Sequence, residues 1–152
     1  MTKPIYVLNG PNLNLLGSRE PDVYGHETLE DVRARCEREA AKLGLAVDFR
    51  QSNHEGELVA WIQEAREKAA GVIINAGAFT HSSIAMLDAL LASELPCVEV
   101  HLSNIFRRES FRHNSYISKG ANGLICGFGP LGYELAVEAL AASIKQKEPV
   151  DG

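Results

Sequence analysis

The strongest constraint on the fold is an alternation of short apolar runs with segments of helical period. Apolar runs of strand length lie at residues 5–8, 71–74 and 123–128, and at 97–100 with Glu99 among them. Residues 45–50 carry an apolar side chain at every second position. Between these runs, apolar side chains recur every three or four residues, as on one face of an α-helix. Strand–helix alternation of this kind predicts a parallel sheet with helices on both faces.

The first helix has the clearest predicted ends. Thr28 is a suitable N-cap, with Asp31 three residues further on as a form of capping box, and Gly44 follows the apolar stripe. The other helices are expected over residues 55–69, from Ser82 or Ser83 to a point before Pro96, and through Leu135 to Ile144, with residues 145–152 as a frayed tail.

Right-handed crossovers favour one arrangement of these elements, a flavodoxin-like α/β three-layer sandwich whose five parallel strands have the order 2-1-3-4-5. The length of 152 residues suits one catalytic domain, residues 1–152, and excludes two. Residues 9–26 and 101–122 are too long for simple connections, and long ordered loops often form lids or binding loops.

Charge and composition exclude several classes of function. The chain has 15 basic and 20 acidic residues, a formal net charge of −5, whereas nucleic-acid binding usually requires a basic surface. No apolar run approaches about 20 residues and the N-terminus lacks the pattern of a signal peptide, so we expect a cytoplasmic protein with no membrane partner. Cys36, Cys97 and Cys126 form no C-x-x-C pair and are expected to be buried, inert thiols.

Polar residues follow four of the five predicted strands. They lie at residues 9–14, 52–54, 75 and 101–104. In an open parallel sheet, ligands bind beyond the carboxyl ends of the strands, so these residues converge on one rim. A single residue such as Asn53 is more often a turn former, but four strand ends together indicate a site.

Glu99 and His101 form the strongest small constellation. Residues two apart on a strand point to the same face, so Glu99 is placed to orient the imidazole and raise its basicity. A histidine held in this way is suited to proton transfer near neutral pH. The alternative is a structural histidine beside a solvated glutamate, and the spacing leaves both interpretations open.

Arg19 and Tyr24 lie on the first long loop. A free tyrosine has a pKa near 10 and is a poor base at neutral pH, but a nearby guanidinium favours the phenolate. The two residues together are candidates for an activated base on a loop that closes over substrate. The alternative is a surface tyrosine packed over the prolyl turn at Pro21.

Other signals are weaker. Gly127, Gly129 and Gly132 spell G-x-G-x-x-G, but they follow the last strand, where a tight turn and close helix packing explain them better than a dinucleotide site. No histidine pair has the spacing of a metal site, although His54, Glu55 and His101 could meet at a metal in space. No lysine occupies a position suited to Schiff-base chemistry.

Several stretches form one ordered pattern along the chain. They are NGPNLNLLG at 9–17, REP at 19–21, YG at 24–25, QSNHEG at 51–56, NAGAFTHSS at 75–83, EVHLSN at 99–104, RESFRH at 108–113, GFG at 127–129 and GY at 132–133. This set resembles the type II 3-dehydroquinate dehydratases over about residues 5 to 140. Ala76, Phe79 and Asn114 depart from residues that are common in the family, and none of them is a proposed catalytic residue.

The resemblance implies a lyase that works without a cofactor or metal. Its small anionic substrate, 3-dehydroquinate, would lose water by anti elimination through an enolate and give 3-dehydroshikimate. The reaction belongs to the shikimate pathway of aromatic amino acid biosynthesis or to quinate catabolism, and the sequence does not separate the two. The resemblance also implies a homododecamer, a tetramer of trimers.

The family's residue roles carry over by position. Tyr24 would take the proton α to the ketone with Arg19 lowering its pKa, and His101, paired with Glu99, would protonate the departing hydroxyl. Asn12 would stabilise the enolate oxygen through a bound water. The residues that would hold the substrate are Asn75, His81, Leu102, Ser103 and Arg112, with Asp88 reaching the site of a neighbouring subunit.

Two other functions remain open from the residues alone. One is a flavodoxin-like module that binds a flavin or nucleotide at the same rim, for which the glycine-rich turns are the main support. The other is an oligomeric scaffold without chemistry, in which the presence of Arg19, Tyr24 and His101 at one rim is a coincidence.

Overall fold

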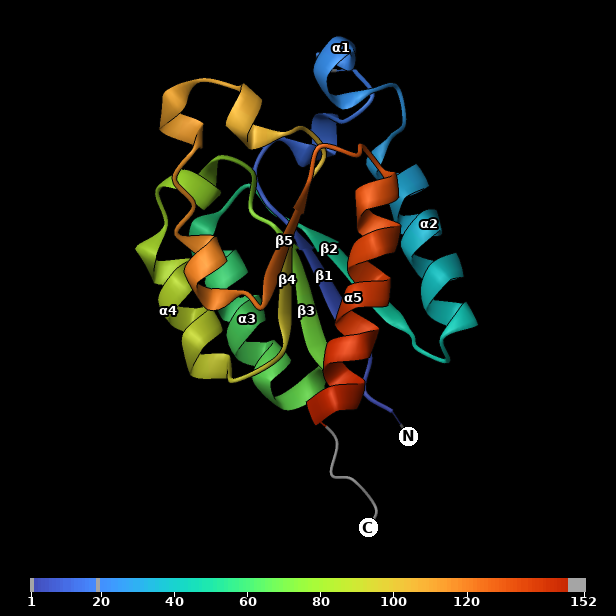
Figure 1. The fold of residues 1–152 in the computed structure, drawn as a ribbon. Helices are drawn as coiled ribbons and strands as arrows, with labels where there is room; N and C mark the ends of the chain where they lie inside the picture. The colour runs from blue at the N-terminus through green and yellow to red at the C-terminus, as the bar shows by residue number, and fades with distance from the viewer. Residues whose placement is uncertain (1, 19, 148–152) are drawn as a thin grey trace.

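The fold is a five-stranded parallel sheet between two layers of helices (Figure 1). The computed structural model describes residues 2–18 and 20–147, without the side chains of Val23 and Tyr24. The strands, in chain order, are β1 (Ile5–Asn9), β2 (Val47–Gln51), β3 (Gly71–Asn75), β4 (Cys97–His101) and β5 (Gly123–Cys126). Their order in the sheet is β2-β1-β3-β4-β5, which confirms the predicted topology.

The helices divide evenly between the two faces. Figure 1 shows α2 (Leu29–Lys42) and α5 (Leu131–Lys147) together on one side of the sheet, with α3 (Glu55–Lys68) and α4 (Ile84–Ser93) on the other. Each face has its own apolar core. Side chains alternate along the strands, so odd-numbered residues of β1 and β3 enter the α2–α5 layer and even-numbered ones enter the α3–α4 layer.

Two helix starts agree with their predicted caps. Asp31 donates its backbone N–H to Thr28 Oγ1 at 3.2 Å, and the Asp31 carboxylate accepts from the Thr28 N–H at 3.0 Å. At α4 the cap is Ser83, whose hydroxyl oxygen accepts from the Met86 N–H at 3.0 Å. Each cap satisfies N–H groups that the first helical turn leaves without a partner.

The prediction of a frayed tail over residues 145–152 is wrong for residues 145–147. Helix α5 continues through Lys147, and the Lys147 ammonium donates to the main-chain oxygen of Glu94, the residue that follows α4. This contact caps an exposed carbonyl and holds the last helical turn, which favours helix where we predicted none. Residues 148–152, the rest of that tail, lie outside the described residues.

The two long connections contain short helical turns. The first includes η1 (Leu13–Leu15) and α1 (Pro21–Tyr24), and the second includes η3 (Ile105–Arg107), η4 (Ser110–Arg112) and η5 (Ile117–Gly120). In Figure 1, α1, η3 and η4 stand above the carboxyl ends of the strands, whereas η5 lies lower, beside α4. Both connections therefore lie where an open parallel sheet binds its ligands.

The cysteine prediction needs one correction. Cys36 and Cys97 are buried, but Cys126 is only half-buried, because β5 is an edge strand with one open side. Over residues 2–18 and 20–147, no group of three or more His, Cys, Asp or Glu side chains is placed to hold a metal ion. No helix in that part of the chain is long and apolar enough to span a membrane.

Candidate active site

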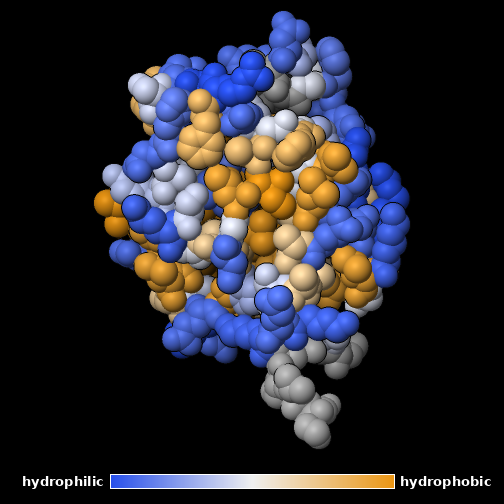
Figure 2. All heavy atoms as spheres, in the orientation of Figure 1, coloured by the Kyte–Doolittle hydropathy of each residue, from blue (hydrophilic) through white to orange (hydrophobic). Residues whose placement is uncertain are grey.

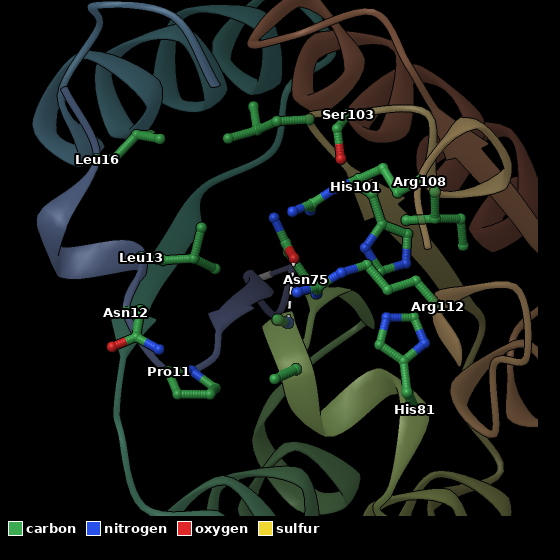
Figure 3. A pocket seen from close by; sticks show the side chains of 14 residues that line it. Pro11, Asn12, Leu13, Leu16, Asn75, His81, His101, Ser103, Arg108 and Arg112 are labelled. Carbon is green, nitrogen blue, oxygen red and sulfur yellow. Dashed lines mark hydrogen bonds between the residues drawn. The ribbon is translucent and has the colours of Figure 1, made fainter. Parts of the chain in front are cut away.

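A pocket opens at the carboxyl ends of β1, β3 and β4, beneath the two long connections (Figure 3). Seven of the predicted site residues line it: Asn12, Asn75, His81, His101, Leu102, Ser103 and Arg112. They come from segments that are far apart in sequence. The structure brings these seven residues to one rim, and the roles assigned to them stay predictions.

The floor of the pocket depends on a close approach of two chain segments. The Gly10 N–H donates to the Asn75 carbonyl at 2.7 Å, and a Cβ atom at Gly10 would lie 2.2 Å from the Ala76 carbonyl oxygen. Only glycine fits there. The chain then turns through Asn12 in the left-handed region, φ 69°, with the Asn12 N–H donating to Asn53 Oδ1 at 3.0 Å. Asn53 thus supports the loop that carries Asn12.

The side chains of His101 and Glu99 form a hydrogen bond beneath the pocket. The distance between His101 Nε2 and Glu99 Oε2 is 2.5 Å, and Glu99 is fully buried. Two hydroxyls complete the carboxylate's shell: Ser115 donates to Oε2 at 2.8 Å, and Ser118 donates to Oε1. The glutamate is not solvated, so the structural-histidine interpretation that relied on solvation is wrong.

The environment of Glu99 keeps it ionised. Burial alone would raise the pKa of this carboxyl, but the hydrogen bond and charge of His101 and the hydroxyls of Ser118 and Ser115 outweigh it and hold the pKa below its usual value. With Nε2 bonded to a carboxylate, Nδ1 is the His101 nitrogen left for the pocket. A carboxylate bonded to one ring nitrogen holds the imidazole in one orientation.

His81 lies beside His101 and Arg112 in Figure 3, on the side of the pocket away from Asn12 and Leu13. Its Nδ1 is 2.9 Å from the carbonyl oxygen of Asn114, so Nδ1 carries the proton and Nε2 is the acceptor in the neutral ring. Burial lowers the pKa of His81, and the nearby charges of His101 and Arg112 lower it further, against the raising effects of the Asn114 carbonyl and Glu99. His81 is therefore neutral near pH 7.

The guanidinium of Arg112 supplies positive charge to the same wall. Its Nε donates to Glu109 Oε2 at 2.6 Å, which anchors the group and leaves the two Nη atoms for other partners. Arg108 lines the pocket as well. Guanidinium groups bind carboxylates through paired hydrogen bonds, so this wall is suited to an anionic ligand.

Of the other predicted site residues, two have side chains that the structure does not describe and one lies away from the pocket. Arg19 lies outside the described residues, as does the side chain of Tyr24, whose backbone ends α1. Asp88 is exposed on α4 and does not line the pocket. Its predicted role concerned a neighbouring subunit and stays a prediction.

Other lining residues had no predicted role. Leu13, Leu16 and Ile105 form an apolar wall, and Pro11, Gly77, Ala78 and Arg108 complete the lining. The apolar spacing of Leu13 and Leu16, three residues apart, was an available signal for a packed loop. Ser115 and Ser118 had no signal, because their contact with Glu99 depends on the path of the second long connection.

The glycine-rich turn after β5 is explained by its backbone. Gly127 and Gly129 have φ values of 94° and 61°, which other residues rarely adopt, and β5 therefore ends at Cys126, two residues earlier than predicted. The Gly129 N–H donates to the Leu102 carbonyl at 2.9 Å, so the turn supports the segment after β4. This agrees with the tight turn predicted there.

Comparisons with known proteins agree with one another. A family model described as "Dehydroquinase class II" matches residues 3–141. The 3-dehydroquinate dehydratase of Brucella canis is 60% identical over 148 residues, 97% of this chain and 94% of that protein. The crystal structure of type II dehydroquinase from Propionibacterium acnes has a TM-score of 0.88 at 47% identity, covering 93% of this chain and 98% of that one. The type II dehydroquinase of Butyrivibrio crossotus has the same TM-score at 42% identity, covering 91% and 97%.

Proposed function

Because this chain belongs to the class II dehydroquinase family, we propose that its rim pocket binds 3-dehydroquinate and removes water from it to give 3-dehydroshikimate. The chain is a hydro-lyase of the shikimate pathway, with quinate catabolism as the other setting for the same reaction. Family membership decides for a lyase against the flavin-binding module and the scaffold. The roles of the individual residues are part of the proposal.

The single observation that carries the proposal is the buried Glu99–His101 pair. The carboxylate holds Nε2 at 2.5 Å, and the ring lines the pocket with its other nitrogen left for substrate. His101 in its doubly protonated form gives a proton to the departing hydroxyl. Until that proton is transferred, the charge of Glu99 stabilises the imidazolium, and the hydrogen bond to Glu99 keeps the ring in one orientation.

The base comes from the first long connection. Tyr24 removes the proton α to the ketone, and Arg19 lowers the pKa of the phenol so that the phenolate forms near neutral pH. This connection follows β1, whereas His101 ends β4. An acid and a base carried by separate segments suit an anti elimination, in which the proton and the hydroxyl leave from opposite faces.

The negative charge that develops on the ketone oxygen needs a donor. Asn12 lines the pocket on the loop after β1, and we assign it the stabilisation of the enolate through a bound water. The carboxylate and hydroxyls of the substrate are held by the wall opposite this loop. The residues assigned to it are Asn75, His81, Leu102, Ser103 and Arg112, the leucine and serine largely through backbone amides. No cofactor enters these steps.

Assembly is part of the same proposal. Figure 2 shows apolar side chains gathered on the face that carries β5 and α5, where Phe128 and Leu131 are 62% and 46% exposed. Exposed apolar area beside an open strand edge favours association with other copies of the chain. We assign a homododecamer, a tetramer of trimers, with Asp88 completing a neighbour's site, and a cytoplasmic location.

The test is a dehydration assay without added cofactor. Purified protein mixed with 3-dehydroquinate is expected to produce enone absorbance, and Tyr24→Phe and His101→Ala should each reduce kcat by about 10²-fold or more. Tyr6→Phe is the matched control, because it removes the same hydroxyl from a residue whose partner is Glu64, in the α3–α4 layer. Thermal melts establish that each variant is folded. Full activity in either site variant would overturn its assigned role.

A further inference from the structure

A buried chain of hydrogen bonds runs beneath the pocket between β1, α5 and β3. We propose that Tyr133 is a positioning residue, which fixes the side-chain amide of Asn75 so that it presents an N–H donor to the substrate. Asn9 and Asn75 are register partners on adjacent strands, and both point into the α2–α5 layer. Tyr133, in the first turn of α5, bonds to both.

The three side chains are buried and are linked through the Tyr133 hydroxyl. Asn9 and Tyr133 are 0% exposed and Asn75 is 4% exposed. The Tyr133 hydroxyl donates to Asn9 Oδ1 at 2.7 Å and accepts from Asn75 Nδ2 at 2.9 Å. We call this set the Asn9–Tyr133–Asn75 relay.

Main-chain groups fix the direction of the relay at both ends. At one end Asn9 Nδ2 donates to the Arg50 carbonyl at 2.9 Å, and at the other the Gly77 N–H donates to Asn75 Oδ1 at 3.2 Å. A carbonyl can only accept and an amide N–H can only donate. The orientation of both asparagine amides is therefore determined, because reversing either one would place two donors or two acceptors together.

This direction has a consequence for the pocket. Asn75 lines it (Figure 3), with Oδ1 bonded to Gly77 and one Nδ2 hydrogen bonded to Tyr133. The second Nδ2 hydrogen remains as a donor that faces the pocket. In the proposal, an oxygen of the bound 3-dehydroquinate accepts it. A flipped amide would instead present a carbonyl oxygen, which repels a carboxylate and suits only a hydroxyl that donates.

The phenol is well suited to this work because it stays protonated. Burial raises the pKa of Tyr133 far above its ordinary value, so the hydroxyl keeps its proton over the whole working range of pH. A neutral phenol that accepts one hydrogen bond and donates another can fix the orientation of both asparagine amides without adding a charge. Phenylalanine has the same ring and removes only this function.

The inference rests on the substrate-binding role proposed above for Asn75. Tyr133→Phe leaves Asn75 Nδ2 without its acceptor, so that only the Gly77 N–H still orients the amide. We expect KM for 3-dehydroquinate to rise about 5–20-fold, the loss of roughly one good hydrogen bond, while kcat changes less than about 3-fold. The inhibition constant of the product 3-dehydroshikimate should rise in parallel, which makes the effect one of binding.

Two controls separate positioning from loss of stability. Tyr6→Phe removes a hydroxyl that donates to Glu64 at 2.6 Å, and it should lower the melting temperature while leaving KM within about 2-fold of the wild type. Asn9→Ala removes the acceptor of the Tyr133 O–H, so the hydroxyl is no longer held in the geometry that accepts from Asn75 Nδ2. It should raise KM in the same direction as Tyr133→Phe, so it tests the relay if the latter fails to fold.

A double-mutant cycle with Asn75→Ala is decisive. If Tyr133 acts through Asn75, Tyr133→Phe should change KM by less than about 2-fold once Asn75 is already alanine. Equal effects in both backgrounds, or an unchanged KM in Tyr133→Phe itself, would overturn the inference. Failure of the proposed function would look different, because the wild type itself would then form no product.

Discussion

The two buried polar networks beneath the pocket differ in charge. The network on β4 faces the α3–α4 layer and holds an ionised carboxylate, Glu99, among His101 and two serine hydroxyls. The Asn9–Tyr133–Asn75 relay faces the α2–α5 layer and contains only neutral groups. A charged network can change the proton affinity of a ring, whereas a neutral one can only orient what it touches. The proposed mechanism uses both, since His101 is assigned the transfer of a proton and Asn75 the binding of the substrate.

The largest effect should come from neutralising the charged network. In Glu99→Gln the side chain keeps its shape but no longer stabilises an imidazolium at His101, so we expect kcat to fall on the order of 10²-fold with a smaller change in KM. The measurement is steady-state kinetics between pH 6 and 9. Glu64→Gln is the matched control, because Glu64 also accepts hydrogen bonds from a side-chain hydroxyl and an arginine but lies away from the pocket. A Glu99→Gln variant with wild-type kcat would remove the distinction between the two networks.

The two networks also differ in how far the sequence predicts them. Glu99 and His101 are two residues apart on a strand, so their common face follows from strand geometry alone. The relay joins residues 9, 75 and 133, and it requires the first turn of α5 to pack between two strand ends. The dipeptide at 132–133 is part of the sequence pattern, but nothing local to it indicates a bond to Asn9.

The same division holds for the fold. The sheet order and both helix layers follow from the apolar periodicity and the handedness of the crossovers, which are properties of local sequence and chain geometry. The helical state of residues 145–147 does not, because it involves the contact of Lys147 with Glu94 in another element. Ser115 and Ser118 reach Glu99 for a similar reason, since only the path of the second long connection brings them there.

An intermediate effect is expected from loosening the charged network without removing its charge. The Ser118 hydroxyl is one of the groups that hold the pKa of Glu99 below its usual value. In Ser118→Ala that pKa should rise and the pairing with His101 should weaken, lowering kcat about 3–10-fold. Ser143→Ala, which removes a hydroxyl bonded only to the Ala139 carbonyl on the surface of α5, should leave kcat unchanged. If Ser118→Ala equals the control, the serines merely fill space around the carboxylate.

The smallest effect concerns how the free energy of unfolding depends on pH. It tests directly the difference between a group that titrates and a relay that does not. Burial lowers the pKa of His81 below its ordinary value near 6.5, so the folded state favours the neutral ring. That preference contributes stability above the ordinary pKa, and the contribution is lost as pH falls through the lowered value. Between pH 7.5 and 5, the free energy of unfolding of the wild type should therefore fall relative to that of His81→Gln. Urea unfolding at each pH measures this difference.

Tyr133→Phe provides the opposite pattern in the same experiment. Its relay has no group that titrates between pH 5 and 7.5, so the variant should be less stable than wild type by about 1–2 kcal/mol, and by the same amount at every pH. A pH-dependent difference for Tyr133→Phe would mean that the relay is coupled to the charged residues across the pocket. A pH-independent difference for His81→Gln would instead mean that solvent reaches the His81 ring freely and that burial does not set its protonation.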